Sequence, residues 1–260
     1  MRTRPRNPRH SQSGFSLIEL LTVLVILTLV MGAVFSQMIQ VQQRYQVEQT
    51  KLDMFQESRE FMDQMSRDLH QAGYPSSKMY GIAILTPPIN NDPRNAVGLV
   101  QVTPTSIIFE GDVDGTGVVS SVRYTLISDP ANPGSCPCWV QRSQVPKVVA
   151  DPLAGQNINP SNEVQNVINS AGTMNIAGNT GGLANQAVYG QYAVNPVFQA
   201  FDSAGNPVSP GAPIDIDTNS AGIKTIKTIR ITLNVLGTQP DMRTHMRPAT
   251  TLTTSIRIEN

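Results

Sequence analysis

A single acid, Glu19, stands near the start of a long apolar run. Residues 15 to 39 have the sequence FSLIELLTVLVILTLVMGAVFSQMI, in which Glu19 is the only charged residue. A carboxylate in hydrocarbon costs on the order of 2.5 kcal/mol or more, so an acid at such a position is expected to have a function and a partner. The first chemistry that the sequence indicates is therefore a carboxylate that is paired inside or at the edge of a membrane.

Cysteine and histidine offer little further chemistry. Cys136 and Cys138 are separated by one proline. They are interpreted either as two buried thiols or as a tight disulfide formed in an oxidising compartment. His10, His70 and His245 are far apart in the sequence, and a cysteine pair alone supplies too few ligands for a metal.

Two aspartates in the segment EGDVDGTG, residues 110 to 117, invite a calcium interpretation. Asp112 and Asp114 have the alternating spacing of a calcium loop, and Gly115 could make the sharp turn. The segment lacks a third acidic position and a glutamate at its twelfth residue. A hairpin turn between two strands explains the same residues, so Asp112 and Asp114 are a weak calcium candidate and no metal is expected.

The sequence shows no arrangement of a nucleophile and a base. It has no serine motif of the nucleophile-elbow kind and no glycine-rich phosphate loop. Asp68 and His70 are close in sequence and are interpreted as part of a solvated helix face rather than as an acid–base pair. We therefore expect a protein that is not an enzyme and that has no cofactor.

Charge is unevenly distributed along the 260 residues. The net charge is zero, with 19 basic and 19 acidic residues, yet residues 1 to 14 hold four arginines and no acid. Without these residues the chain has 15 basic against 19 acidic residues and is mildly acidic. A mildly acidic body without a basic and aromatic patch argues against nucleic acid as a partner.

The apolar run and the basic residues before it predict a membrane anchor. About 20 apolar residues span the hydrocarbon core as a helix. The positive-inside rule keeps residues 1 to 14 in the cytoplasm and sends the rest of the chain outward. A secretory signal peptide has a shorter apolar region and a small-x-small cleavage site, which residues 33 to 36 match poorly. A plain single-pass anchor fits the hydropathy but gives no reason for Glu19.

The segment SGFSLIELL, residues 13 to 21, resembles the cleavage and methylation motif of type IV prepilins and type II secretion pseudopilins. The resemblance implies that a prepilin peptidase cuts between Gly14 and Phe15 and methylates the freed amine of Phe15. Glu19 is then the fifth residue of the mature chain. Its carboxylate can meet the amine of a neighbouring subunit, which offsets the burial of both charges.

Two further segments resemble particular members of that superfamily. Residues 67 to 74, RDLHQAGY, resemble the helix end of PilW-like minor pilins and of J-type pseudopilins, which usually have arginine in place of His70. Residues 255 to 260, SIRIEN, resemble the terminal strand of minor pilins, although Glu259 departs from the usual form. The resemblance implies a minor subunit of a type IV pilus, with a J-type pseudopilin or an adhesion or DNA-uptake subunit as alternatives.

The same resemblance implies partners and a location. The partners are other pilins or pseudopilins, the prepilin peptidase and methyltransferase, and an inner-membrane assembly platform. The location is the bacterial inner membrane, with a cytoplasmic N-terminus and a periplasmic C-terminal domain. From there the subunit enters a pilus or pseudopilus.

One long helix must carry the N-terminal chemistry. No proline occurs between Pro8 and Pro75, and the sequence predicts a helix from about Ser16 to Ala72 that Gly73 ends. Residues 1–14 are the cleaved leader, residues 15–39 the apolar half and residues 40–74 the amphipathic half. An apolar stripe is predicted to pack on the chain's own globular part, with a coiled coil as the alternative. Its members are Val41, Tyr45, Leu52, Phe55, Met62, Met65 and Leu69.

The remainder, residues 75–260, predicts a β-rich domain. Short β-like runs alternate with turn residues, with strands expected at 97–103, 106–110, 118–127, 198–202, 229–235 and 252–258. Residues 151–194 are rich in Asn, Gly, Ala and Gln. They predict a long surface excursion or a variable loop that carries subunit-specific contacts. The expected fold is α+β and type IV pilin-like, with the helix packed on an antiparallel sheet that has long loops.

Overall fold

The computed structural model describes most of the chain, which divides into two units, Met1–Gln46 and Val47–Asn260. The described residues are 14, 16–76, 79, 93–130, 133, 135–148, 152–154, 158–169, 175–176, 189–192, 195–208, 214–215, 220–241 and 246–258. Helix α1 (Leu17–His70) contributes to both units. The second unit thus contains the last part of the helix together with the sheet.

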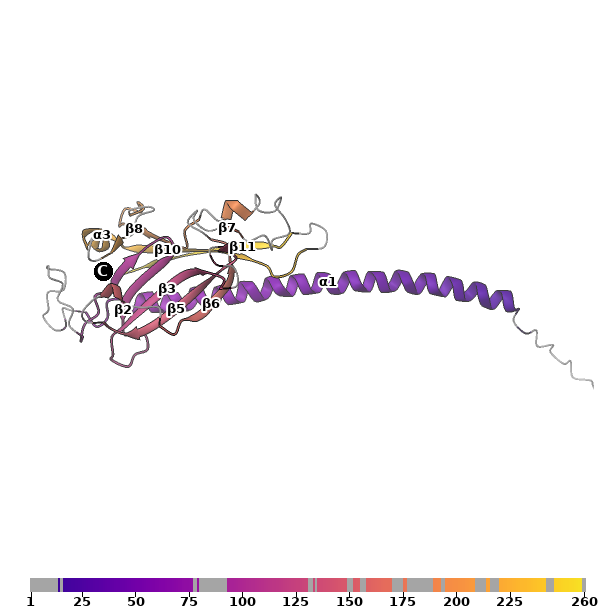
Figure 1. Cartoon of the computed structure of the whole chain (residues 1–260), viewed down its shortest axis with the longest axis horizontal. Coiled ribbons are helices and arrows are strands. Elements are labelled where there is room, and N and C mark those ends of the chain that lie inside the picture. Colours follow the sequence, from indigo (N-terminus) through magenta and orange to yellow (C-terminus); the bar gives the residue numbers. More distant parts are fainter. Residues whose placement is uncertain are drawn as a thin grey trace, which may run out of the picture. The chain divides into compact units, whose positions relative to one another are not determined.

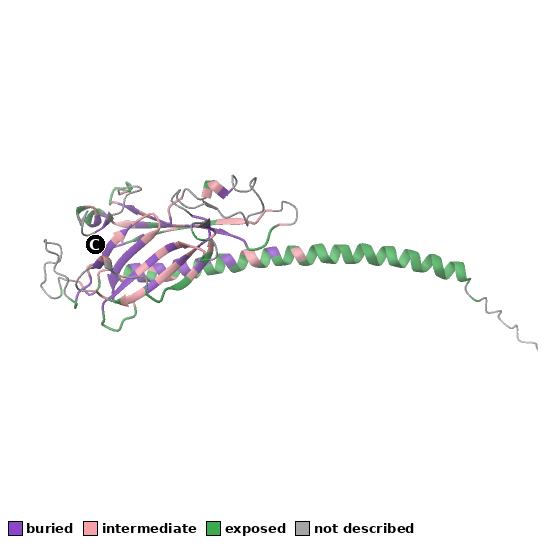
Figure 2. Cartoon of the chain, in the orientation of Figure 1, coloured by how far each residue is buried: buried purple, intermediate pink, exposed green. Residues whose placement is uncertain are grey.

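In the first unit, α1 is an apolar helix whose side chains are exposed. Every residue from Leu17 to Gln42 is exposed, and Figure 2 shows this stretch in green throughout. Both threonine hydroxyls in this stretch are hydrogen-bonded within the helix. The Thr22 hydroxyl donates to the Glu19 carbonyl oxygen, and the Thr28 hydroxyl donates to the Val25 carbonyl oxygen. The helix is long and apolar enough in this part to cross a membrane.

In the second unit, α1 buries one face against the sheet. The buried residues are Val47, Met54, Ser58, Phe61, Met62, Met65, Asp68 and Leu69. Met65 and Leu69 are fully buried, and each such side chain contributes on the order of 2 kcal/mol. The prediction that the stripe packs on the globular part is confirmed for Met62, Met65 and Leu69. It is wrong for the first four members, which lie on a different face of the helix and stay exposed.

Helix α1 ends at His70, close to the predicted end, and Gly73 has a φ of +85° that favours glycine. The Gly73 amide donates to the Glu110 carbonyl oxygen at 2.9 Å, and Ala72 forms an isolated bridge with Gly111. A Cβ on Gly111 would lie 2.5 Å from the Gln71 carbonyl oxygen, so only glycine permits this approach. The end of α1 is thereby joined to a strand of the sheet.

Nine strands form one antiparallel sheet among the described residues. They are β1 (Leu99–Val102), β2 (Ser106–Gly111), β3 (Ser120–Ser128), β5 (Cys138–Pro146), β6 (Ser161–Val167), β8 (Phe198–Phe201), β9 (Ile214–Asp215), β10 (Thr228–Leu236) and β11 (Ala249–Arg257). Their order is β11-β10-β6-β5-β3-β2-β1-β9, and β8 also pairs with β10. Figure 1 shows β2, β3, β5 and β6 alongside the C-terminal part of α1. The helix and sheet confirm the predicted α+β, pilin-like fold.

Smaller elements complete the second unit. Strands β4 (Ser135–Cys136) and β7 (Asn175–Ile176) pair in parallel as a separate two-stranded sheet. Helical elements of this unit include the 3₁₀ helix η2 (Pro152–Ala154) and α3 (Ser220–Thr225). Strand β6, with Val164 and Val167 fully buried, lies within the segment 151–194, so that segment is not a surface excursion throughout.

The alternation predicted for residues 229–235 holds at one end of β10 only. Ile229, Ile231 and Leu233 are fully buried, and Arg230 between them is exposed. Asn234 breaks the pattern because it is also fully buried. Its side chain donates to the Tyr192 carbonyl oxygen and accepts from the Thr251 hydroxyl, so both polar groups are satisfied.

Candidate functional site

The N-terminal segment places Glu19 in the first turn of α1. The Ser16 carbonyl oxygen accepts from the Glu19 amide at 3.0 Å and from the Leu20 amide at 3.2 Å, which starts the helix. An acid in the first turn is favoured by the positive end of the helix dipole. The predicted cleavage site is only partly described. Gly14 is exposed with open space around it, whereas Phe15 and residues 1–13 lie outside the described residues.

Glu19 is exposed and has no side-chain partner among the described residues. Its neighbours in sequence are exposed large apolar side chains: Leu17 is 78% exposed, Ile18 is 70% and Leu20 is 58%. A carboxylate surrounded in this way is compatible with water but becomes costly once the apolar side chains are covered by lipid or protein. The arrangement is therefore suited to accept a cation from a second molecule.

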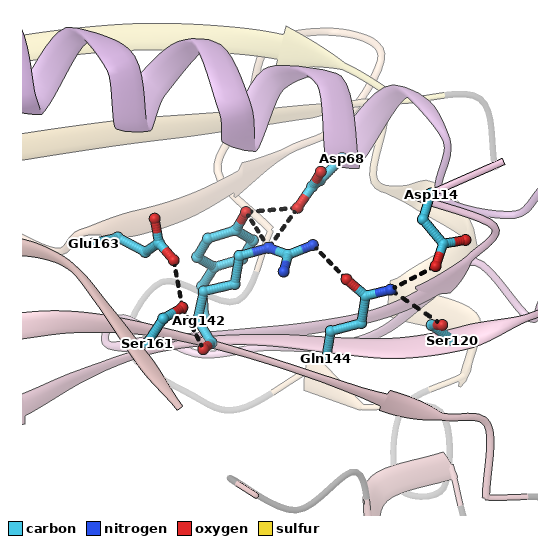
Figure 3. Close-up of polar contacts among 8 residues, drawn as sticks. Asp68, Asp114, Ser120, Arg142, Gln144, Ser161 and Glu163 are labelled. Atoms are coloured by element: carbon cyan, nitrogen blue, oxygen red, sulfur yellow. Dashed lines mark hydrogen bonds and ion pairs between the residues drawn. The ribbon is translucent and has the colours of Figure 1, made fainter. Parts of the chain in front are cut away.

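A second carboxylate on α1, Asp68, is in the opposite situation. Asp68 is 6% exposed, and its Oδ2 accepts from the Tyr124 hydroxyl at 2.6 Å and from Arg142 Nε at 2.8 Å. Figure 3 shows the Arg142 guanidinium between Asp68 and Gln144, to whose Oε1 it donates at 2.9 Å. The interpretation of Asp68 as part of a solvated helix face is wrong, because the sheet packs over that side of the helix.

Aromatic rings surround this ion pair. The Tyr124 ring lies 5.6 Å from the Phe61 ring in a T-shaped arrangement and 6.3 Å from the Phe109 ring, on which it stacks. Burial, and then the negative charge of Asp68, raises the pKa of Tyr124, so its hydroxyl stays protonated and donates. The Tyr124 and Asp68 oxygens raise the pKa of Arg142 although burial opposes this. The cluster holds α1 to strands β3 and β5.

A second buried ion pair was not predicted from the sequence. Lys147 Nζ lies 2.9 Å from Glu110 Oε2, and the two side chains are 2% and 0% exposed. The lysine also donates to the Asn95 carbonyl oxygen at 2.6 Å, and Glu110 Oε2 accepts from the Val97 amide at 2.9 Å. Burial raises the pKa of Glu110, and Lys147 opposes that shift. Neither residue belongs to a motif, so only the fold brings them together.

The remaining candidates lie in the second unit. Cys136 and Cys138 form a disulfide in the structure, and both are fully buried. Asp112 and Asp114 lie in the loop between β2 and β3, where each accepts a backbone amide of the loop. Within the described ranges, no group of three or more His, Cys, Asp or Glu side chains is placed to hold a metal ion.

Comparison with known proteins identifies the N-terminal segment. Residues 9–35 match the family model described as the prokaryotic N-terminal methylation motif. No significant match was found among curated proteins or among solved structures. The matched residues include Gly14, Phe15 and Glu19 together with most of the exposed apolar helix. The match supports a type IV pilin-like or pseudopilin-like subunit on the evidence of the N-terminal segment alone.

Proposed function

We propose that the chain is a minor pilin-type subunit, which a prepilin peptidase processes and which is incorporated into, or primes, a type IV pilus. The observation that carries the proposal is the methylation motif at residues 9–35 on an apolar helix whose side chains are exposed from Leu17 to Gln42. A structural subunit needs such a surface, because helix packing against other subunits and lipid is what covers it.

Cleavage between Gly14 and Phe15 would create the cation that Glu19 lacks. The new amine belongs to Phe15, one helical turn before Glu19, and the peptidase would methylate it. An amine of one subunit and the Glu19 of a neighbour shifted along the assembly axis then form an ion pair in an apolar layer. Such a pair offsets the desolvation of both groups and sets the register between subunits.

Charge and cysteine chemistry support an inner-membrane protein with a periplasmic domain. The four arginines of residues 1–14 favour a cytoplasmic N-terminus. The disulfide between Cys136 and Cys138 suits an oxidising compartment such as the periplasm. The partners are other pilins, the prepilin peptidase and an inner-membrane assembly platform, and no nucleic acid is expected.

The helix end at residues 67 to 74 favours a minor subunit. The resemblance to PilW-like proteins covers Asp68, whose carboxylate the sheet satisfies, and Gly73, which lies just past the end of the helix. This helix end thus has a structural task in joining α1 to the sheet. A J-type pseudopilin shares the same segment, so deletion of the gene decides between the two: lost piliation supports the pilus, and lost secretion with intact pili supports the secretion machine.

Processing tests the proposal at its first step. We expect Gly14→Ala to block cleavage, because the peptidase accepts almost no side chain at that position. The precursor would then persist on a gel at its full size. The matched control is Gly32→Ala, a glycine inside α1 with open space around it, which should be processed normally. Cleavage of Gly14→Ala at the normal rate would overturn the proposal.

A further inference from the structure

The loop between β2 and β3 holds two acids that neither the fold nor the proposed function requires. Gly111 and Ser120 form the last pair of the β2–β3 hairpin, and residues 112–119 connect them. Asp112 and Asp114 lie in this connection, and their side chains interact with each other. Two carboxylates in contact repel unless a proton or a cation lies between them.

Each carboxylate uses one oxygen to fix the loop and leaves the other free of loop amides. Asp112 Oδ2 accepts from the Gly117 amide at 2.9 Å. Asp114 Oδ1 accepts from the Thr116 amide at 3.2 Å and from its hydroxyl at 2.8 Å. The remaining oxygens are Asp112 Oδ1 and Asp114 Oδ2, and the latter accepts a hydrogen bond from Gln144 Nε2 at 3.4 Å.

The free oxygen of Asp112 points to a ligand independently of the loop geometry. Asp112 is 7% exposed, and its Oδ1 is shielded from solvent without a hydrogen-bond partner in the described part of the chain. A buried carboxylate oxygen left unpaired costs more than a neutral group would. A bound cation is one group that would satisfy it while also neutralising Asp114.

The order of ligand groups along the loop fits calcium. With Asp112 in the first position, Asp114 is third and the Thr116 hydroxyl fifth. The sixth position, where a calcium loop needs a glycine for its sharp turn, is Gly117, with a φ of +80°. Gly115, which was expected to make this turn, lies two residues earlier, at the fourth position. The seventh position offers the Val118 carbonyl oxygen.

Side chains from the sheet complete one side of the loop. Ser120 takes the ninth position, and Figure 3 shows it converging with Asp114 on the Gln144 amide. The twelfth position is Arg123 rather than the usual bidentate glutamate. Fewer charged ligands lower calcium affinity, so the expected Kd is that of weak extracellular sites, on the order of 10⁻⁴ to 10⁻³ M.

We propose that residues 112–120 bind one calcium ion through Asp112 Oδ1, Asp114 Oδ2 and neutral oxygens of the loop, with water in the remaining positions. The loop is joined to the end of α1, because the Asp112 amide donates to the Tyr74 carbonyl oxygen at 2.9 Å. Calcium would therefore stabilise the junction of helix and sheet. This proposal does not depend on the pilus assignment.

The test uses the full chain in detergent micelles, titrated calorimetrically with CaCl₂ or MgCl₂ after chelator treatment. We expect calcium to bind with a sub-millimolar Kd and to raise Tm, since a ligand that binds only the folded state stabilises it. Asp114→Asn should weaken calcium binding by about tenfold or more. Asp114 is exposed, so this variant is expected to fold even where Asp112→Asn does not.

The matched control is Asp202→Asn. Asp202 also accepts backbone amides in an exposed turn, from Ala204 and Asn206 at 2.8 Å, but without a second acid. It should leave calcium binding unchanged. No calcium binding up to about 10 mM, an equal response to magnesium, or full binding by Asp114→Asn would each overturn the proposal.

Discussion

Two of the acids on helix α1, Glu19 and Asp68, differ in exposure and in hydrogen-bond partners. Glu19 is exposed among apolar side chains and has no partner among the described residues. Asp68 is buried, and the sheet supplies it with a cation, Arg142, and a hydroxyl donor, Tyr124. The part of the helix around Asp68 has its charge paired within the chain. The part around Glu19 exposes a charge and an apolar surface that another molecule could contact.

This difference separates folding from assembly along one helix. In the second unit, Phe61, Met65 and Leu69 are buried, so that part of α1 belongs to the core of the chain. In the first unit, apolar residues as large as Phe35 and Met38 are more than half exposed. Since exposed patches of this kind mark binding or membrane surfaces, a change in the first unit should alter assembly and a change in the second should alter stability.

The largest effect is expected from Glu19→Val. We expect processing to remain intact, because Glu19 lies beyond the cleavage site, but incorporation beside other subunits to be lost. The reason is that an amine buried between subunits would have no anion. Co-purification with the other minor subunits measures incorporation, and normal co-purification would contradict the comparison.

The matched control for Glu19 is Glu48→Val. Glu48 is an exposed acid on the same helix, and its carboxylate forms an ion pair with Lys51 at 2.8 Å. Exposed pairs of this type contribute less than about 1 kcal/mol. The variant should assemble normally and unfold at nearly the wild-type midpoint.

The next effect is expected from Arg142→Met, which leaves Asp68 as a buried charge without a cation. Removing one partner of a buried pair costs about 3–5 kcal/mol. Denaturant unfolding followed by fluorescence of Trp139, the single tryptophan, measures this loss in the second unit. Processing of the precursor should be unaffected.

Arg123→Met is the control that shows what the loss of an arginine without a carboxylate partner costs. Arg123 lies on β3 and is half-buried, its Nε has no hydrogen-bond partner within the described ranges, and burial lowers its pKa. Its replacement by an apolar side chain should cost little or be favourable. Equal destabilisation by the two variants would show that the pairing with Asp68 contributes nothing specific.

The role of Glu19 could be predicted from the sequence, whereas the surroundings of Asp68 could not. Glu19 was identified because burying a carboxylate in an apolar run costs free energy wherever that run lies. The end of α1 shortly before Gly73 follows from local backbone preferences. The partners of Asp68 could not be predicted. Arg142 is 74 residues away in sequence, and nothing local to either residue records that β5 crosses the helix at this point.

The apolar stripe shows the same limit. Helical spacing predicted that Leu52 and Met62 share a role, yet Leu52 is 62% exposed and Met62 is buried. Val47 and Met54, on either side of Leu52 in the sequence, are both buried, so this part of the helix is covered on another face. Periodicity identifies the faces of a helix but not which face the sheet covers. The buried pair of Glu110 and Lys147 carries no sequence signal at all, because charged residues are exposed by default and only the completed fold removes them from water.

A smaller effect is expected from Tyr124→Phe, which removes one donor but keeps the cation. Asp68 Oδ2 would still accept from Arg142 Nε, so the charge remains paired. A hydrogen bond to a charged group contributes about 1.5–3 kcal/mol, less than the loss of the ion pair. The same fluorescence measurement should therefore place Tyr124→Phe between wild type and Arg142→Met.

Tyr189→Phe serves as the neutral reference for Tyr124. The Tyr189 hydroxyl donates to the Arg247 carbonyl oxygen at 2.7 Å, and this acceptor carries no charge. Its loss should cost about 0.5–1.5 kcal/mol. A larger cost for Tyr189→Phe than for Tyr124→Phe would mean that the negative charge of Asp68 does not strengthen its hydrogen bond.

The smallest effect is expected from Asp202→Asn. Glu19 and Asp68 differ both in exposure and in hydrogen-bond partners, and Asp202 allows these two properties to be tested separately. Asp202 is only partly buried, unlike Asp68, yet its carboxylate accepts hydrogen bonds as that of Asp68 does. The Asn206 amide, and then its side chain and the Ala204 amide, lower the pKa of Asp202 below its ordinary value of 3.8. Because the folded pKa is the lower one, the unfolded chain binds more protons in this range.

The contribution of Asp202 to stability is therefore fully present above pH 3.8 and is lost as the pH falls through the folded pKa. Asp202→Asn should be slightly less stable than wild type near neutral pH, and the difference should vanish in acid. Denaturant unfolding at a series of pH values measures it. A difference that stays constant with pH would mean that the charge of the Asp202 carboxylate gains no stability from its hydrogen-bond partners. Burial alone would then distinguish Asp68 from Glu19.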